Sequence, residues 1–288
     1  MPTKKPPEFG PTQRLQRMYE AGIRKITGRV ILKKQPEETF ATWYAKLVQR
    51  ANAPDVQAAA FLLAKQMVHS VSKTNYRTWR EAAAKTSKSQ LLYQYLQAEM
   101  AGATGSRVHQ IVCENANLIS SLPLEAARTM TDEVMKAQQS GARPKTLAKM
   151  ASKRFPELLR SRVHLISRTE TAKASSALTQ ARCERLNLDW FEWETSHDKR
   201  TRTSHKNMNA VLCSWSDLPS PEKLVGEKDY GKYAAGGTFN CRCLVIPLLS
   251  FSDVSWPHRV YWRGAIRQMN LQEFKRIAGG GVEERDAA

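Results

Sequence analysis

The chain has 288 residues, of which 41% are hydrophobic and 25% charged, a composition that is typical of a globular protein and excludes a largely disordered one. Its 45 Lys and Arg residues against 27 Asp and Glu residues give a formal net charge of +18. Because Lys and Arg displace counterions from phosphates, this excess favours a polyanionic partner, although solubility through charge repulsion is the alternative.

The cysteines and the apolar segments indicate the cellular compartment in which the protein is made. The five cysteines, Cys113, Cys183, Cys213, Cys241 and Cys243, are odd in number and irregularly spaced, which argues against a secreted disulfide scaffold. We find no apolar run long enough for a membrane span, and no apolar segment that would make the basic start of the chain a signal peptide. The sequence therefore predicts a protein synthesised in a cytoplasm, with no membrane partner.

Residues 1–36 are predicted to form a basic N-terminal arm. Its prolines favour a solvated tail, whereas Leu15, Met18, Tyr19 and Ile23 stand at helical spacing and favour a short docked segment. Either form could order against a partner. The residues predicted to bind nucleic acid or another partner are Lys4, Lys5, Arg14, Arg17, Arg24, Lys25, Arg29, Lys33 and Lys34.

Residues 37–155 are predicted to form a helical domain of about five to seven helices. Apolar stripes recur at helical spacing, for example from Phe40 to Val48 and from Leu91 to Met100. These stripes indicate a packed core, and no catalytic constellation stands out among them. Turn chemistry predicts breaks at Ala53-Pro54, Gly102–Gly105, Leu122-Pro123 and Gly141–Pro144.

Residues 156–250 are predicted to form a small α+β module. A long helix is expected from Pro156 to about Leu186, because proline suits a first helical turn. Alternation around Trp190–Trp193 then predicts a strand. Further strands are expected at Val211–Trp215 and Cys243–Ile246, separated by a loop from Pro219 to Gly237.

Residues 251–288 are predicted to form a C-terminal tail with one short helix near Leu271–Ile277. The predicted fold class is thus mainly α with a small α+β C-terminal module. It comprises a helical N-terminal region, a long helix and a few short antiparallel strands.

A charged group follows the predicted strand: Asp198, Arg200, Arg202 and His205. An aspartate among arginines can accept charge-assisted hydrogen bonds from a guanidinium fork and so fix a loop. Alternatively, Asp198 could orient His205 as an acid/base pair, or Arg200, Arg202 and Lys206 could contact phosphate. We favour the structural interpretation, because no nucleophile, oxyanion donor or phosphate-binding glycine loop accompanies the pair.

Cys241 and Cys243 form half of a zinc-binding pattern, since strong zinc signals consist of two paired cysteine motifs. Candidate metal ligands are His205, Cys241 and Cys243, with Cys213, His197 or Asp198 as a fourth. The alternative is that both cysteines are small hydrophobic residues at the start of a strand. We therefore expect no cofactor, with zinc as the alternative.

One further charged group, Arg168-Thr169-Glu170, lies within the predicted long helix. Glu170 could pair with Lys173 or Arg168 along the helix, or the group could orient the later block. Both interpretations stay open.

Four elements now follow one another in a recognisable order: Arg168-Thr169-Glu170 on a helix, a strand ending at Trp193, Asp198-x-Arg200-x-Arg202-x-x-His205, and Asn240-Cys241-Arg242-Cys243. Their order and spacing, over roughly residues 120 to 250, resemble the phage head morphogenesis proteins of the Mu F-like minor head family. Relatives often carry a further cysteine after the Arg-Thr step and a His-Pro before Cys-Arg-Cys, which this chain lacks. Position 210, often glycine in relatives, is alanine here.

The resemblance implies a non-enzymatic minor component of a tailed-phage head. Such a protein would associate with the portal protein inside the procapsid and lie near the portal vertex of the virion. It would contact packaged double-stranded DNA nonspecifically and could leave with it on ejection. The major capsid or scaffolding protein is a further candidate partner. The alternative function is a metal-dependent nuclease or related transferase that uses Asp198, Arg200, Arg202 and His205.

Overall fold

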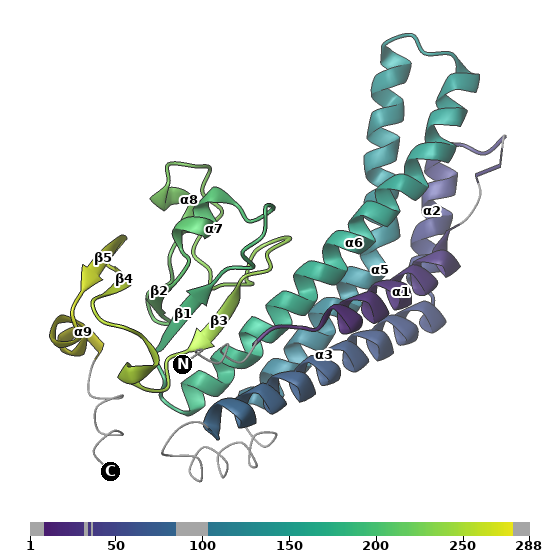
Figure 1. Ribbon diagram of the computed structural model, residues 1–288. Helices are drawn as coiled ribbons and strands as arrows, with labels where there is room; N and C mark the ends of the chain where they lie inside the picture. Colours follow the sequence, from purple (N-terminus) through teal and green to yellow (C-terminus); the bar gives the residue numbers. More distant parts are fainter. Residues whose placement is uncertain (1–8, 32–33, 36, 85–102, 279–288) are drawn as a thin grey trace. The chain divides into compact units, whose positions relative to one another are not determined.

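The computed structural model describes residues 9–31, 34–35, 37–84 and 103–278, which are mainly helical and end in a small sheet (Figure 1). This confirms the predicted fold class. The longer helices are α1 (Gln13–Val30), α2 (Phe40–Ala51), α3 (Pro54–Ala83), α5 (Ala103–Gln139), α6 (Pro144–Arg185) and α9 (Leu271–Ala278). The short helices are α7 (Thr203–Asn207), α8 (Pro221–Leu224) and the 3-10 turn η2 (Phe251–Asp253). None of the described helices combines the length and hydropathy of a membrane span.

The described chain divides into two compact units. The helical unit contains residues 12–69 and 109–170, and the sheet unit contains the remaining described residues. The division passes through helices α3, α5 and α6, so the units do not follow one another along the chain as the predicted segments do. Each unit is described by itself below.

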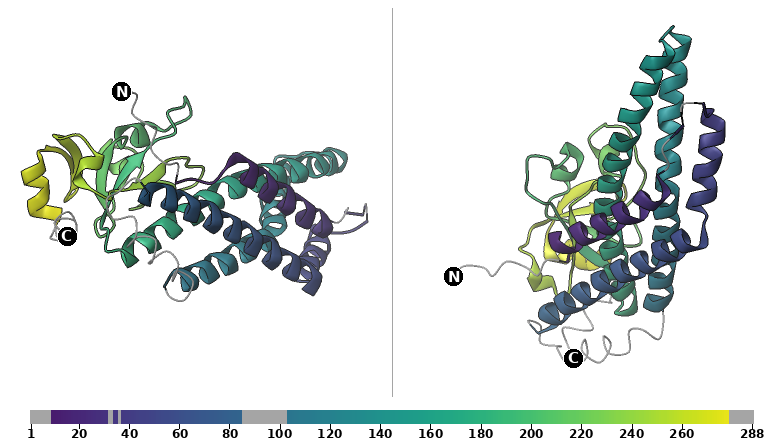
Figure 2. Two further views of the ribbon diagram at one scale, coloured as in Figure 1. Left: turned by 60° about the horizontal axis from the view of Figure 1, so that its bottom comes forward. Right: turned by 90° about the vertical axis from the view of Figure 1, so that its right-hand side faces the viewer.

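Helix α1 is an integral part of the helical unit. The Thr12 hydroxyl caps its N-terminus by accepting a hydrogen bond from the Leu15 amide. Leu15, Tyr19 and Ile23 are buried, and the Tyr19 hydroxyl donates to Asn115 Oδ1 on α5 at 2.8 Å. Figure 2 shows α1 crossing the longer helices of this unit. Of the two alternatives for residues 13–30, the structure shows the docked segment and not the solvated tail, because the apolar face of this helix is covered by its own chain.

Two prolines lie inside long helices, where the sequence predicted a break and a helix start. Pro123 is inside α5 and Pro156 is inside α6. Each proline removes one helical hydrogen bond, but the flanking Leu122 and Phe155 are buried, and this packing maintains the helix. The breaks at Ala53-Pro54 and Gly141–Pro144 are confirmed. The stripe from Leu91 to Met100 lies outside the described residues.

The sheet has five strands in the order β3-β1-β2-β4-β5. Their bounds are β1 (Trp190–Glu194), β2 (Val211–Ser214), β3 (Leu244–Pro247), β4 (His258–Trp262) and β5 (Ala265–Met269). The pairing of β2 with β4 is parallel and the others are antiparallel. Residues 251–288 were expected to be a tail with one helix, but β4 and β5 extend the sheet.

Strand β1 lies between β3 and β2, and an apolar cluster packs against each of its faces. Trp190 packs on one side with Phe274 of α9, their ring centroids 4.8 Å apart. Phe191 and Trp193 pack on the other side with Cys213 and Tyr233. Figure 2 shows α9 at the β4–β5 end of the sheet. Alternate residues of this strand therefore face two different apolar cores, whereas in a half-exposed strand every second residue faces solvent.

Candidate functional site

The loop between β1 and β2 carries Asp198, Arg200, Arg202 and His205, and Asn209 closes it. Asn209 Oδ1 accepts hydrogen bonds from the Thr195 amide at 3.1 Å and the Thr195 hydroxyl at 2.7 Å. The Ala210 amide then donates to the Trp193 carbonyl at 2.9 Å. Ala210 adopts a φ of 53°, a left-handed conformation that favours glycine. The closed loop places α7, with His205, against the buried face of β1.

Asp198 is held by an arginine that the sequence did not single out for this role. Arg242, the central residue of Cys-Arg-Cys, makes a bidentate ion pair with the Asp198 carboxylate, Nη2 lying 2.7 Å from Oδ1. Asp198 Oδ1 also accepts from the Arg200 amide at 2.9 Å. The Arg242 hydrogen bonds hold the pKa of Asp198 below its usual range. Asp198 therefore joins the loop to the segment before β3.

His205 faces the two cysteines of that segment. Its Nδ1 lies 3.5 Å from Cys241 Sγ and 3.4 Å from Cys243 Sγ, and all three side chains are 3% exposed. Asn240, with a φ of 56°, turns the chain just before Cys241. The hydrogen bond between the two thiols lowers the pKa of Cys241 and raises the pKa of Cys243. The structure thus brings together three residues that the sequence marked as metal-ligand candidates.

The three residues considered as a fourth ligand are engaged elsewhere. The Cys213 thiol donates to the Val211 carbonyl at 3.7 Å, and His197 Nε2 lies 2.7 Å from Glu194 Oε1. Asp198 is paired with Arg242 as described above. Within the described ranges, the cluster of His, Cys, Asp and Glu side chains that could hold a metal consists of His205, Cys241 and Cys243.

Glu222 and Tyr233 complete the site, and the sequence analysis missed both. The Tyr233 hydroxyl lies 3.1 Å from His205 Nε2 and donates to the Glu222 carboxylate at 2.6 Å. Glu222 is fully buried and also accepts from the Ser204 hydroxyl at 3.3 Å. Burial, reinforced by Glu222, raises the pKa of Tyr233. Both residues lie in the segment predicted as a loop, where no local pattern distinguishes them from ordinary surface residues.

The other basic residues of the block do not converge on Asp198 through their side chains. The Arg202 guanidinium donates to the Phe239 carbonyl at 2.9 Å and lies 4.2 Å from the centroid of the Phe239 ring. Arg200 and Lys206 are exposed. The Asp198/Arg200/Arg202/His205 set is therefore not assembled as an acid/base centre, since His205 contacts Tyr233 and the cysteines while Asp198 contacts Arg242.

Arg168, Thr169 and Glu170 lie on α6, in the helical unit. Arg168 Nη2 is 2.9 Å from His164 Nε2, one helical turn earlier. Thr169 and Glu170 are buried, and the charge of Glu170 adds to the effect of burial in raising the pKa of Tyr19. Arg168 and Glu170 thus both interact with residues of the helical unit, His164 and Tyr19.

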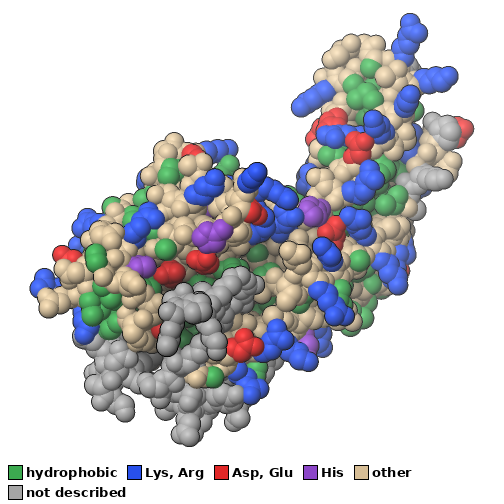
Figure 3. All heavy atoms as spheres, viewed as in Figure 1, with side chains coloured by type: hydrophobic (Ala, Val, Ile, Leu, Met, Phe, Trp, Pro, Cys, Tyr) green, Lys and Arg blue, Asp and Glu red, His purple; other side chains and the backbone are tan. Residues whose placement is uncertain are grey.

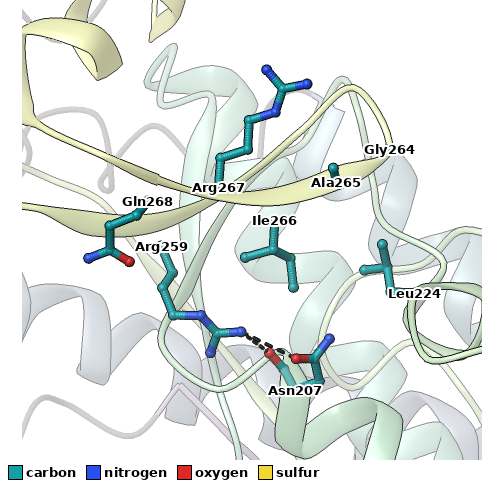
Figure 4. Close-up of a pocket in the computed structure, with 8 residues that line it drawn as sticks. All are labelled: Asn207, Leu224, Arg259, Gly264, Ala265, Ile266, Arg267 and Gln268. Atoms are coloured by element: carbon teal, nitrogen blue, oxygen red, sulfur yellow. Dashed lines mark hydrogen bonds between the residues drawn. The ribbon is translucent and has the colours of Figure 1, made fainter.

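A pocket of about 480 Å³ opens beside the β4–β5 hairpin (Figure 4). Its lining residues are Asn207, Leu224, Arg259, Gly264, Ala265, Ile266, Arg267 and Gln268. Arg259 donates to the Asn207 carbonyl at 2.7 Å and to the Asn209 carbonyl at 3.2 Å, so it satisfies carbonyl groups at the end of α7. Arg267 points away from the other lining residues in Figure 4. The lining residues include no carboxylate, histidine or cysteine, so the pocket offers no general base.

Comparison with known proteins supports the resemblance drawn from the motifs. Residues 128–246 match the family of phage Mu protein F like proteins, which confirms the resemblance for this part of the chain. A protein of Haemophilus influenzae described as uncharacterized is 29% identical over 147 residues, 51% of this chain and 30% of that relative. The chain thus spans less than a third of that relative's length. No solved structure matches the chain.

Proposed function

We propose, from the Mu F-like segment at residues 128–246, that the chain is a minor head protein of a tailed phage that associates with the portal during procapsid assembly. The family match is the observation that carries this proposal. The matched segment runs from α5 through α6 to β3, so it includes the braced loop, Cys-Arg-Cys and the Arg168–Glu170 group. We propose that this folded component lies inside the head near the portal vertex.

The geometry of the block supports an architectural role over an enzymatic one. Asp198 and Arg242 fix the loop before α7, and Glu222 and Tyr233 fix His205. A general base needs access to a substrate proton, and His205 is 3% exposed. These residues thus hold the β1–β2 loop and α7 in place, which is a structural role.

Two basic surfaces of the helical unit support nonspecific contact with packaged DNA. The outer face of α1 exposes Arg14, Arg17, Arg24, Lys25 and Arg29. Glu20 neutralises Arg24 at 2.5 Å, and the other four have no ion pair in the described structure. The turn between α5 and α6 and the beginning of α6 expose Arg143, Lys145, Lys149 and Lys153. Figure 3 shows Lys and Arg side chains gathered at this turn. Lys4, Lys5 and Lys33 lie outside the described residues.

The location of the chain in assembled particles tests the head assignment. We expect quantitative mass spectrometry of purified procapsids and filled heads to find the chain in low copy number. Heads assembled without portal protein should lack it. Its absence from heads that contain portal would contradict the proposal. If ejection carries the chain out with the DNA, emptied heads should lose it, whereas an internal head component that stays would be retained.

Salt dependence tests the DNA contact. We expect the full chain to bind double-stranded DNA of any sequence, with an affinity that falls steeply as salt rises. A plot of the logarithm of the binding constant against the logarithm of the salt concentration should have a slope of about −0.9 per phosphate contact. A variant with Arg14, Arg17, Lys25 and Arg29 changed to Gln should reduce that slope. A second variant changes Arg143, Lys145, Lys149 and Lys153 to Gln and measures the other surface. A smaller slope in both variants would assign contact to both surfaces, and absence of binding at low salt would overturn the DNA contact.

The same preparation tests the alternative that the chain is a nuclease. Wild-type protein is incubated with DNA and Mg²⁺ beside the His205→Ala and Asp198→Asn variants. We expect no cleavage above background in any sample. Cleavage by the wild type that disappears in His205→Ala would contradict the non-enzymatic assignment.

A further inference from the structure

We propose that His205 Nδ1 and the thiolates of Cys241 and Cys243 together bind one Zn²⁺ ion. The Nδ1 atom lies 3.5 and 3.4 Å from the two sulfur atoms, and the three donor atoms all lie within 4.8 Å of one another. In tetrahedral zinc sites, Zn–S bonds of about 2.3 Å and Zn–N bonds of about 2.0–2.1 Å put sulfur and nitrogen ligands about 3.5 Å apart. The observed separations therefore fit a common metal ion.

Hydrogen bonding among the three groups explains the arrangement less well. A neutral imidazole nitrogen is either a donor or an acceptor, and each role provides one well-directed bond. Here two sulfur atoms approach the same Nδ1 atom at nearly equal distances. One metal ion can be bound by all three donor atoms at once, whereas Nδ1 forms a well-directed hydrogen bond with one sulfur atom and leaves the other sulfur to the bond between the two thiols.

The contacts of the opposite ring nitrogen leave Nδ1 free to bind a metal. The Tyr233 hydroxyl donates to Glu222, which as a carboxylate accepts only. The Tyr233 oxygen must therefore accept from Nε2–H of His205, at 3.1 Å. This assigns the proton to Nε2 and leaves the Nδ1 lone pair facing the cysteines. Metal-bound histidines usually donate their second N–H to such a chain of acceptors.

The residue types and their burial select zinc over other common cations. Thiolates and imidazole are soft or intermediate ligands that favour Zn²⁺ over Mg²⁺ or Ca²⁺. All three side chains are almost fully buried. The Cys243 amide also donates to Cys241 Sγ at 3.4 Å, a bond that stabilises a thiolate.

The ion would join α7 to the segment that leads into β3. Gly236 packs against that segment, and a Cβ there would lie 3.3 Å from the Cys243 carbonyl oxygen. The described His, Cys, Asp and Glu residues supply three ligand atoms. The fourth tetrahedral position is thus left to a water molecule or another oxygen donor. Because His205 and both cysteines are buried, the open position is also shielded from solvent, and we assign the ion the role of joining α7 to β3.

Metal content of the purified full chain tests the site. Elemental analysis should give about one zinc per chain for the wild type. Cys241→Ser, Cys243→Ser and His205→Asn should each lower the ratio to below about a tenth. Cys113→Ser, a change at a half-buried cysteine outside the cluster, is the matched control and should keep the full ratio. Retention of zinc by all three cluster variants would overturn the proposal.

A spectroscopic measurement on the wild type keeps the test independent of how the variants fold. Replacing zinc by Co²⁺ should give thiolate-to-cobalt charge-transfer absorption that saturates at one equivalent. Tyr233→Phe should weaken Co²⁺ affinity by about 10- to 100-fold, because it removes the hydrogen-bond acceptor that orients His205, and such losses have this effect in other metal sites. Absence of zinc together with absence of this absorption would refute the site. Incorporation of the chain into heads is a separate readout, so failure of the metal site leaves the head assignment standing.

Discussion

The helical unit and the sheet unit are stabilised in different ways. In the helical unit, buried residues such as Leu47, Val56 and Ile119 recur along regular helices, and the Tyr19–Asn115 hydrogen bond is a buried link between α1 and α5. The core of the sheet unit instead encloses a chain of polar groups that runs from His205 through Tyr233 to Glu222. On an apolar helix face, a substitution lowers stability roughly in proportion to the buried area it removes. In a buried polar chain, removing one group also leaves its neighbours without a hydrogen-bond partner.

Trp193→Ala should have the largest effect on stability. Trp193 is fully buried, and its ring centroid lies 5.5 Å from that of His205 and 6.1 Å from that of Tyr233. Truncation removes the surface that encloses the polar chain and should lower the free energy of unfolding by about 3–5 kcal/mol. Urea unfolding followed by circular dichroism gives the total, and hydrogen exchange locates it. Faster exchange confined to the helical unit would contradict the assignment.

Tyr233→Phe should come next and sharpens the comparison. The change leaves the buried Glu222 and His205 without a shared partner, which should lower the free energy of unfolding by about 1–3 kcal/mol. Tyr230→Phe is the control, because Tyr230 is 48% exposed. Equal unfolding midpoints in urea for the two variants would show that the polar chain contributes little.

Tyr19→Phe makes the same chemical change in the helical unit and should have a smaller effect. It breaks one hydrogen bond to Asn115 Oδ1, while Asn115 keeps its bond from Nδ2 to the Ile111 carbonyl. We expect a loss of about 0.5–1.5 kcal/mol. A double-mutant cycle with Asn115→Ala isolates the pair. A loss larger than that of Tyr233→Phe would reverse the proposed difference between the units.

Asp198→Asn should have the smallest effect, and that effect should depend on pH. The Arg242 guanidinium lowers the pKa of Asp198, so the ion pair stabilises the fold above the ordinary carboxyl pKa of about 3.9. This stability is lost as the pH falls through the lower folded-state pKa. Because both side chains are partly exposed, about 1 kcal/mol or less is expected near neutral pH. Thermal melts of wild type and variant should converge in acid, and a constant difference would exclude the ion pair as the cause.

Local sequence patterns predicted those helices, strands and turns whose formation depends mainly on residues close together in the chain. Helical spacing identified α2 by Trp43 and Leu47, and alternation identified β1 by Trp190 and Trp193. Turn chemistry located the breaks at Ala53-Pro54 and Gly141–Pro144. The same patterns failed at Pro123 and Pro156, where packing of the flanking residues outweighs the local preference of proline.

The β4–β5 hairpin was missed although a local signal existed. Arg263 and Gly264 both have positive φ, 49° and 84°, as a two-residue hairpin turn between strands requires. The sequence Tyr261-Trp262-Arg263-Gly264-Ala265 therefore carried a recognisable turn between strand-forming residues. The parallel pairing of β2 with β4 had no such signal, because it joins strands that are far apart in the chain.

For the site, the sequence by itself supplied the candidate residues, and only the tertiary structure decided their partners. Residue types alone marked Asp198, His205, Cys241 and Cys243 as groups capable of ion pairing or metal binding. The fold assigned Arg242 to Asp198 and brought Tyr233 and Glu222 behind His205. A hydrogen bond or an ion pair requires atoms within a few ångströms, and Asp198 and Arg242 are 44 residues apart. Such a distance is closed by sheet pairing and core packing, which spacing along the chain does not encode.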